Sequence, residues 1–254
     1  MYKLTEICGE TYGAYPVCKI DFYLPDRDPS ETPLYIHFHG GGLEGGSRRD
    51  RYVIELAEKY GIAVASADYR MYPTAKFPEF IEDAAAACAY VLKKTGNSYK
   101  SVTVGGSSAG AYLSMMLYFD PQYLAAVGLQ AEEFDGFIFD AGQPTTHYNV
   151  LRERGLDSRA IRVDEASPMY FIDKKLANPE EKPPVLILNA ERDMENRREQ
   201  TMLLMGVMKT FGYDMSKVTY VLLDDCRHCE YCGKRGADGE VLVNPILAEF
   251  LCGR

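Results

Sequence analysis

The segment from Val102 to Gly110 constrains the fold more than any other part of the chain, because it reads Val-Thr-Val-Gly-Gly-Ser-Ser-Ala-Gly. It contains Gly-x-Ser-x-Gly centred on Ser108, after β-branched residues and before a predicted helix over Ala109–Phe119. In that setting the serine is expected on a tight strand-to-helix turn, where the flanking glycines avoid clashes that a Cβ would cause. Ser108 is therefore the predicted nucleophile. Ser107 is the competing candidate, but it lacks a glycine two residues further on.

Short apolar runs alternate with helical patterns along the chain, which predicts an α/β fold with a mostly parallel central sheet flanked by helices. We interpret residues 1–254 as a single domain. Val17–Leu24 alternates as a half-buried edge strand would. The predicted strands are Val17–Leu24, Leu34–Phe38, Ile62–Ala67, Ser101–Val104, Gly136–Asp140, Val185–Asn189 and Val218–Leu223. The predicted helices are Arg49–Tyr60, Phe77–Lys94, Ala109–Phe119, Glu195–Phe211 and Pro245–Leu251.

A second motif, His39-Gly40-Gly41-Gly42, follows the predicted strand Leu34–Phe38 directly. Consecutive glycines let the backbone approach a ligand and present free N–H groups. Together with the amide that follows a nucleophilic serine, such N–H groups form an oxyanion hole. We expect His39 to order this loop through its side chain and not to transfer protons.

An acid and a base are predicted beyond the last two strands of the sheet. Asp193 follows Val185–Asn189, and His228 follows Val218–Leu223, which gives the chain order Ser, Asp, His of this fold. His228 is the predicted general base, and Asp193 is predicted to orient it. The other histidines are His37, His39 and His147, and none of them follows the last strand. Glu191 and Glu195 lie close to Asp193 and are alternative acids.

Residues 141–181 interrupt the alternation of strands and helices, with only a modest helical signal near Pro168–Leu176. A long segment of this kind in a compact domain is commonly functional, so we interpret it as a small cap insertion over the site. An ordinary surface excursion is the alternative. Gln143 and His147 are the candidate substrate contacts, together with the neighbouring Tyr148 and Asn149, and a surface loop explains them equally well.

The motifs resemble those of the hormone-sensitive-lipase-like branch of the α/β hydrolases. The resemblance is carried by His39-Gly-Gly-Gly, Gly106-Ser-Ser-Ala-Gly, Asp68-Tyr-Arg and Ala166-Ser-Pro. It implies a carboxylesterase for small or medium acyl esters that needs no cofactor and no metal. It also implies a triad of Ser108, Asp193 and His228, with the amides of Gly41, Gly42 and Ala109 as oxyanion donors.

The chain departs from that branch in ways that leave the substrate open. Ser107 stands where many members have aspartate, Ala111 stands where a further glycine is usual, and few residues precede Leu34. These departures bring acetyl esterases and arylformamidase-like members closer. An amidase or an exopeptidase on the same fold is therefore the alternative function, and a non-catalytic binding protein on a hydrolase scaffold is a lesser one.

Composition narrows the partners. The formal net charge of −9 disfavours binding to nucleic acid. The sequence contains no run of 18 apolar residues, so we expect no membrane-spanning helix. The N-terminal sequence lacks the apolar core of a secretory signal, and the seven cysteines are an odd number, so a cytoplasmic protein with reduced thiols is expected. A small-molecule ester is the expected partner, and a homodimer is compatible with the sequence.

Three cysteines surround His228, at Cys226, Cys229 and Cys232. Thiolates and imidazole are ligands that suit zinc. However, His228 cannot serve both as a base and as a metal ligand, and no second pair of ligands is evident. We therefore interpret the cluster as reduced thiols near the site.

Overall fold

The computed structural model describes residues 1–96, 98–172 and 179–253, and its centre is a sheet of eight strands in the order β1-β2-β4-β3-β5-β6-β7-β8. The strands from β3 to β8 run parallel, whereas β2 is antiparallel to both β1 and β4. The strands are β1 Leu4–Thr11, β2 Lys19–Pro25, β3 Pro33–Phe38, β4 Ala63–Ala67, β5 Ser101–Ser107, β6 Gly136–Asp140, β7 Val185–Arg192 and β8 Val218–Arg227.

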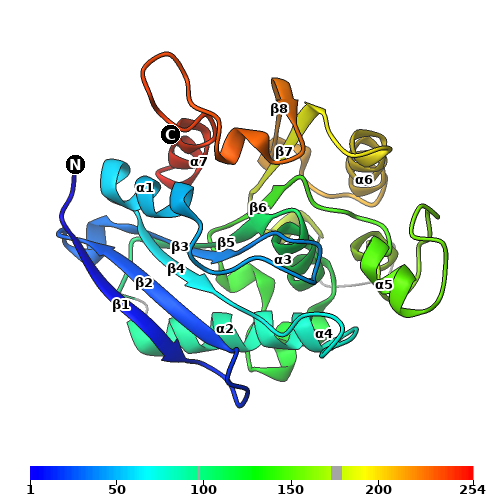
Figure 1. Cartoon of the computed structure of the whole chain (residues 1–254), viewed down its shortest axis with the longest axis horizontal. Helices are drawn as coiled ribbons and strands as arrows, with labels where there is room; N and C mark the ends of the chain where they lie inside the picture. The colour runs from blue at the N-terminus through cyan, green and yellow to red at the C-terminus, as the bar shows by residue number, and fades with distance from the viewer. Residues whose placement is uncertain (97, 173–178, 254) are drawn as a thin grey trace.

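Helices cover both faces of this sheet (Figure 1). The helices are α1 Arg51–Tyr60, α2 Glu79–Thr95, α3 Ala109–Phe119, α4 Pro121–Ala126, α5 Tyr148–Glu153, α6 Arg197–Thr210 and α7 Asn244–Leu251. One apolar core includes side chains of α1 and α7, and the other includes side chains of α2, α3 and α6. Every residue of α3 is buried, so this helix is held between the sheet and other elements. The predicted α/β architecture is confirmed.

The N-terminal edge of the sheet differs from the prediction. The sequence favoured Val17–Leu24 as an edge strand, but β2 lies between β1 and β4, and most of its residues are buried. The outer strand is β1, which the sequence analysis did not predict. The prediction that Val17–Leu24 is an edge strand was therefore wrong. Strand β1 pairs with the outer side of β2 and is itself the edge strand.

Two other boundaries also differ. A second short helix, α4, which the sequence analysis did not predict, follows α3, and Pro121 occupies its first turn, where the Asp120 side chain accepts a hydrogen bond from the amide of Gln122. Proline suits a first turn because its missing N–H has no intrahelical acceptor there. Strand β8 continues to Arg227, four residues beyond the predicted end, and so reaches His228 directly.

The part of residues 141–181 that the structure describes is anchored to the domain. It contains α5 and short 3-10 turns at Pro168–Phe171 and Pro179–Glu181. The hydroxyl of Tyr112 in α3 donates to Ala166 O at 2.8 Å, and Asn149 Nδ2 donates to Gly42 O at 2.7 Å. The second half of the helical signal near Pro168–Leu176 lies outside the described residues. These contacts hold the segment against α3 and the glycine loop, and its role as a cap stays a prediction.

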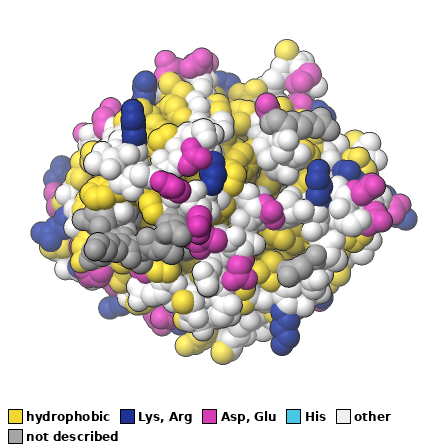
Figure 2. Space-filling view, turned by 180° about the vertical axis from the view of Figure 1, so that it is seen from behind, with side chains coloured by type: hydrophobic (Ala, Val, Ile, Leu, Met, Phe, Trp, Pro, Cys, Tyr) yellow, Lys and Arg dark blue, Asp and Glu magenta, His cyan; other side chains and the backbone are white. Residues whose placement is uncertain are grey.

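The surface carries dispersed charges of both signs. On the face in Figure 2, Asp and Glu side chains alternate with Lys and Arg side chains, and hydrophobic side chains are exposed between them. Within the described part of the chain, no helix combines the length and apolarity that crossing a membrane requires.

Candidate active site

Ser108 lies at the junction of β5 and α3, in a backbone conformation that L-residues rarely adopt. Its φ is 53° and its ψ is −110°, and its amide donates to Asp140 O at 2.7 Å. A Cβ at Gly106 or at Gly110 would collide with the carbonyl oxygen of Phe38 in β3. The two glycines therefore let α3 approach the sheet closely, and this close approach produces the sharp turn at the predicted nucleophile.

The structure brings Ser108, His228 and Asp193 into one chain of hydrogen bonds. His228 Nε2 lies 2.8 Å from Ser108 Oγ, and His228 Nδ1 lies 2.5 Å from Asp193 Oδ1. The three residues follow β5, β8 and β7, whose carboxyl ends meet at one edge of the sheet. The imidazole thus contacts a hydroxyl with one nitrogen and a carboxylate with the other, the arrangement that activates a serine nucleophile.

Asp193 is held in an environment that keeps it ionised. Its side chain is only 2% exposed, and burial alone would raise its pKa. The hydrogen bond from His228 and those from the amides of Met194 and Ala190 outweigh burial, so the pKa of Asp193 is below its usual value. The two alternative acids point elsewhere. Glu191 accepts from the Asp225 amide, and Glu195 is exposed at the rim of a pocket.

The glycine loop lies directly against the serine. A Cβ at Gly40 would lie 3.4 Å from the Ser108 Cβ. Gly42 has a φ of 66°, and a Cβ there would collide with the hydroxyl of Tyr148. Among the described residues, none accepts a hydrogen bond from the amides of Gly41 and Gly42. The amide of Ala109 begins α3 and has no intrahelical acceptor. These three predicted donors are therefore available to a ligand.

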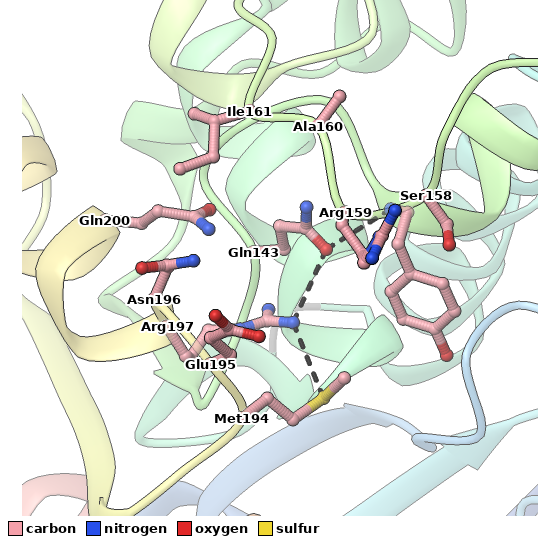
Figure 3. Close-up of a pocket in the computed structure, with 11 residues that line it drawn as sticks. Gln143, Ser158, Arg159, Ala160, Ile161, Met194, Glu195, Asn196, Arg197 and Gln200 are labelled. Atoms are coloured by element: carbon pink, nitrogen blue, oxygen red, sulfur yellow. Dashed lines mark hydrogen bonds between the residues drawn. The ribbon is translucent and has the colours of Figure 1, made fainter.

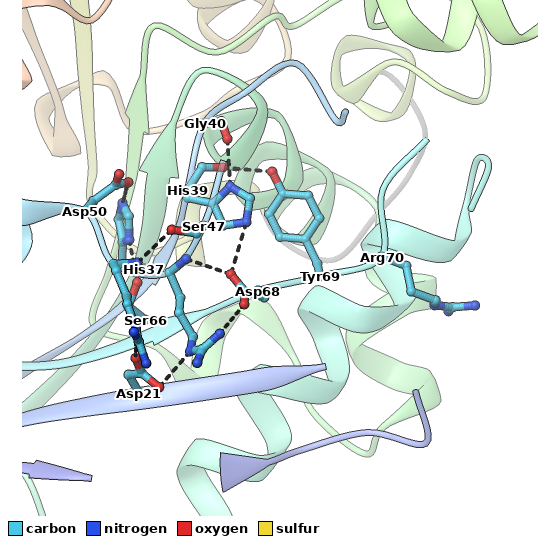
Figure 4. A network of polar contacts seen from close by, with 12 residues as sticks. Asp21, His37, His39, Gly40, Ser47, Asp50, Ser66, Asp68, Tyr69 and Arg70 are labelled. Carbon is cyan, nitrogen blue, oxygen red and sulfur yellow. Dashed lines mark hydrogen bonds and ion pairs between the residues drawn. The ribbon is translucent and has the colours of Figure 1, made fainter. Parts of the chain in front are cut away.

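A buried polar network supports the glycine loop from behind (Figure 4). His39 Nδ1 lies 2.7 Å from Gly40 O, and the ring stacks on Tyr69 at 4.5 Å between centroids. The Tyr69 hydroxyl donates to His39 O at 2.8 Å. Burial lowers the pKa of His39, which favours the neutral ring and a donor role for Nδ1. The geometry fits the expectation that His39 orders the loop.

The same network ties the loop to the antiparallel side of the sheet. Asp68 accepts from the Arg48 amide at 2.7 Å, and the Arg48 Nε donates to Asp21 of β2 at 2.6 Å. Asp68 also faces His39 Nε2 at 3.6 Å. Paired charges of this kind fix the backbone that follows the glycine loop.

A pocket of about 240 Å³ lies next to Asp193 in the sequence, because Met194 is part of its wall (Figure 3). Its wall is formed by described residues of the segment 141–181 and by the start of α6, and it is lined by Gln143, Tyr148, Ser158, Arg159, Ala160, Ile161, Met194, Glu195, Asn196, Arg197 and Gln200. Gln143 is therefore in the pocket wall, as a substrate contact would be. His147 is not. It is buried, it accepts from the Asn149 amide at 3.2 Å, and its ring contacts Tyr112 and Tyr148.

The sequence analysis missed Arg197 as a pocket residue. It is the first residue of α6, only 3% exposed, and its guanidinium points toward Gln143 and Met194. Its position four residues after Asp193 is the only sequence signal that could have drawn attention to it. Such a spacing does not reveal burial.

The three cysteines around His228 are separated by the fold. Cys226 is buried in the core beneath α1 and α7, whereas Cys229 and Cys232 are half-buried and line a second hollow with Gly40, Gly41 and Ser107. The His228 ring is committed to Ser108 and Asp193. The described residues include no group of three or more His, Cys, Asp or Glu side chains arranged to hold a metal ion.

Known esterases and lipases are similar to this chain in sequence. The BD-FAE family model matches residues 20–136. Human hormone-sensitive lipase is 31% identical over 156 residues, which are 59% of this chain and 14% of the lipase. The acetyl esterase of Salmonella schwarzengrund is 30% identical over 97 residues, which are 36% of this chain and 30% of that protein. The chain therefore matches less than a third of the length of either relative.

Solved structures define the fold. A truncated carbohydrate esterase from gut microbiota superposes with a TM-score of 0.76 at 18% identity, over 99% of this chain and 96% of that one. The chain thus has the α/β-hydrolase fold. Its sequence is similar to those of hormone-sensitive lipases and acetyl esterases, so the resemblance predicted from its motifs is confirmed.

Proposed function

We propose that this chain is a serine carboxylesterase that hydrolyses small or medium acyl esters. The observation that carries the proposal is the continuous contact from Asp193 through His228 to Ser108, at 2.5 Å and 2.8 Å, on a turn with a positive φ at the serine. A non-glycine residue in this conformation costs about 1–3 kcal/mol, and such strain is typical of functional sites. The similarity to esterases and lipases supports the same reading.

In the proposed mechanism, Ser108 Oγ attacks the ester carbonyl while His228 Nε2 accepts its proton. Asp193 stabilises the imidazolium that forms, which its lowered pKa favours. The amides of Gly41, Gly42 and Ala109 stabilise the oxyanion of the tetrahedral intermediate. His228 then protonates the leaving alcohol, and a water molecule repeats the sequence on the acyl-enzyme.

The pocket supports a preference for small substrates. Its volume is about 240 Å³, and that of the hollow beside Gly40, Gly41 and Ser107 is about 370 Å³, so both are at or below the lower end of the range of roughly 300–1,000 Å³ that is typical of sites for drug-sized ligands. We therefore expect p-nitrophenyl acetate and butyrate to be hydrolysed with a higher kcat/KM than the octanoate.

The proposal is tested with these three esters and two serine variants. Ser108→Ala should lower kcat by at least about 10⁴-fold, because it removes the group that forms the acyl-enzyme. Ser107→Ala is the matched control, since Ser107 precedes Ser108, while the hydrogen bond to His228 Nε2 is made by Ser108. It should keep kcat within about threefold of the unaltered protein. Activity that survives in Ser108→Ala would overturn the assignment.

An N-formyl anilide separates the esterase from the alternative amidase, since the same triad serves both reactions. Hydrolysis of the esters but not of the anilide supports the proposed function. Turnover of the anilide alone would replace it with an amidase.

A further inference from the structure

Arg197 is a buried cation that has no carboxylate partner in the described part of the chain. Its guanidinium donates to Ala141 O at 3.3 Å and to Gln143 Oε1 at 3.4 Å, and both contacts are longer than most hydrogen bonds. Its Nε is buried without an acceptor. Buried charges are normally paired, because leaving water without a compensating partner is costly. An arginine in this state at the wall of a pocket has capacity for an anion.

We infer that Arg197 binds a carboxylate of the substrate, so that the preferred esters of this site carry a negative charge on their acyl or alcohol part. The inference rests on the proposed function and deepens it by naming a substrate class. It follows from the position of the guanidinium in the pocket wall, where it points toward Gln143 and Met194 (Figure 3).

The other charges of the pocket do not neutralise Arg197. Arg159 is exposed and already pairs with Asp157 at 2.7 Å. Glu195 is exposed, and no ion pair joins it to Arg197 in the described part of the chain. Asp193 is the carboxylate that acts most strongly on Arg197, but its oxygens accept from His228 and from the amides of Met194 and Ala190. The pocket therefore has one buried positive charge without a dedicated counter-ion.

The side-chain amides of Gln143 and Gln200 lie in the pocket wall with Arg197, and Gln200 has a donor that an anion there could use. Gln143 is fixed by its Nε2, which donates to Thr146 O at 3.0 Å, and by its Oε1, which faces Arg197 and the Tyr148 amide. Gln200 accepts from the Thr145 hydroxyl at 2.7 Å, which leaves its Nε2 as a donor in the pocket wall. A carboxylate there would receive hydrogen bonds from a guanidinium and from a neutral amide, the donors that such a group prefers.

The pocket is close enough to Ser108 for one substrate to reach both. Arg197 donates to the carbonyl of Ala141, and the preceding carbonyl, that of Asp140, accepts from the Ser108 amide. At the other end of the pocket, the Tyr148 hydroxyl lies against Gly42 of the glycine loop. Met194, also in the wall, follows Asp193 directly. The wall is thus continuous with the elements that hold the predicted nucleophile, acid and oxyanion donors.

The test compares esters that differ in one charge. On the alcohol side, 4-acetoxybenzoate is compared with 4-acetoxybenzamide. On the acyl side, the mono-4-nitrophenyl ester of glutaric acid is compared with 4-nitrophenyl butyrate. We expect kcat/KM to favour the carboxylate in at least one pair by about tenfold or more, and Arg197→Met to reduce that ratio to about one.

Arg198→Met is the matched control, because Arg198 is the next residue of α6 and is exposed. It should keep the preference of the unaltered protein. Equal hydrolysis of charged and neutral esters in both pairs would overturn the inference. So would an Arg197→Met variant that loses activity toward all four esters alike, since this would mean that Arg197 only supports Asp193.

A binding measurement separates failure of this inference from failure of the proposed function. Benzoate and glutarate should raise the Tm of the Ser108→Ala protein, whereas benzamide should not, and adding Arg197→Met should remove the rise. This readout needs no turnover. If neither anion raises the Tm, the inference fails even where neutral esters are hydrolysed. If the anions raise it but no ester is hydrolysed, the proposed function fails and the anion site stands.

Discussion

At the scale of single residues, the hydrogen bonds around Asp193 keep its carboxylate ionised. Its carboxylate accepts hydrogen bonds from His228 and from two backbone amides, and these bonds lower its pKa despite its burial. A neutral amide in its place would keep the shape of the side chain but would lose the charge that stabilises an imidazolium.

We therefore predict that Asp193→Asn lowers kcat for p-nitrophenyl butyrate by about 10³–10⁴-fold, with a smaller change in KM. Glu195→Gln is the matched control, because Glu195 lies two residues away and was an alternative acid. It should retain kcat within about twofold. A larger loss in Glu195→Gln than in Asp193→Asn would transfer the role of the acid to Glu195.

The sequence predicted the residues whose roles depend on local patterns. Ser108 was predicted from its flanking glycines, and His228 from its position after the last strand; the structure places the two side chains within hydrogen-bond distance, and their catalytic roles stay a prediction. Arg197 and Asp140 were not found, because their significance is burial, which depends on contacts between segments far apart in the chain. His147 shows the reverse. Its position in the predicted cap suggested a substrate contact. In the structure its ring contacts Tyr112 and Tyr148, and it does not line the pocket.

Among the elements, the contact between α3 and β3 determines the geometry of the serine turn. Gly110, in the first turn of α3, lies so close to Phe38 that an added Cβ would overlap its carbonyl. Backbone cannot give way as the end of a flexible side chain can. The helix would have to move away from the sheet, and Ser108 would move with it.

We predict that Gly110→Ala destabilises the protein by at least about 2 kcal/mol in urea unfolding and lowers activity further than stability alone explains. Gly206→Ala, in the middle of α6, is the opposite case, because nothing lies within 4 Å of a Cβ there. This variant should gain about 0.5–1 kcal/mol, as alanine is the better helix former. Equal effects of the two variants would argue against a packing role for Gly110.

Most elements could be predicted because their apolar patterns are strong, but β1 could not. Its residues alternate between half-buried and exposed positions, and the segment Leu4–Thr11 includes Gly9 at a register shift against β2. An irregular outer strand buries little apolar surface, so its sequence pattern is weak. Without β1, the next strand looked like the edge.

For the whole molecule, Asp140 couples stability to pH. It ends the central strand β6, and it accepts hydrogen bonds from the Tyr231 hydroxyl and the Cys232 thiol, which follow β8. Burial raises its pKa to about 7, although the Tyr231 hydrogen bond opposes the rise. The carboxyl is therefore neutral in the folded protein at a pH at which it is ionised in the unfolded chain.

The pKa of Asp140 is higher in the folded protein than in the unfolded chain. Its contribution to stability is therefore fully present at a pH below the pKa of the unfolded chain, and it is lost as the pH rises through the pKa of the folded protein. Between about pH 4 and about pH 7, Asp140 should lower the free energy of unfolding by up to about 1.4 kcal/mol per pH unit. Asp140→Asn should remove this slope in urea titrations at about pH 5 and about pH 7. Asp224→Asn, at an exposed position, should leave it unchanged. The same slope in Asp140→Asn and the unaltered protein would contradict the prediction.

The strand order has a consequence for how activity is lost. In the described sheet, His228 follows β8, which pairs with β7 on one side and with no described strand on the other, whereas Ser108 follows β5, which lies between β3 and β6. Amides of a marginal strand open by local fluctuation more readily than those of a central one. Fraying of β8 alone would carry the base away from a serine that is still in place. Catalysis would then stop while most of the chain is still folded, so turnover would report partial opening before any probe of global structure does.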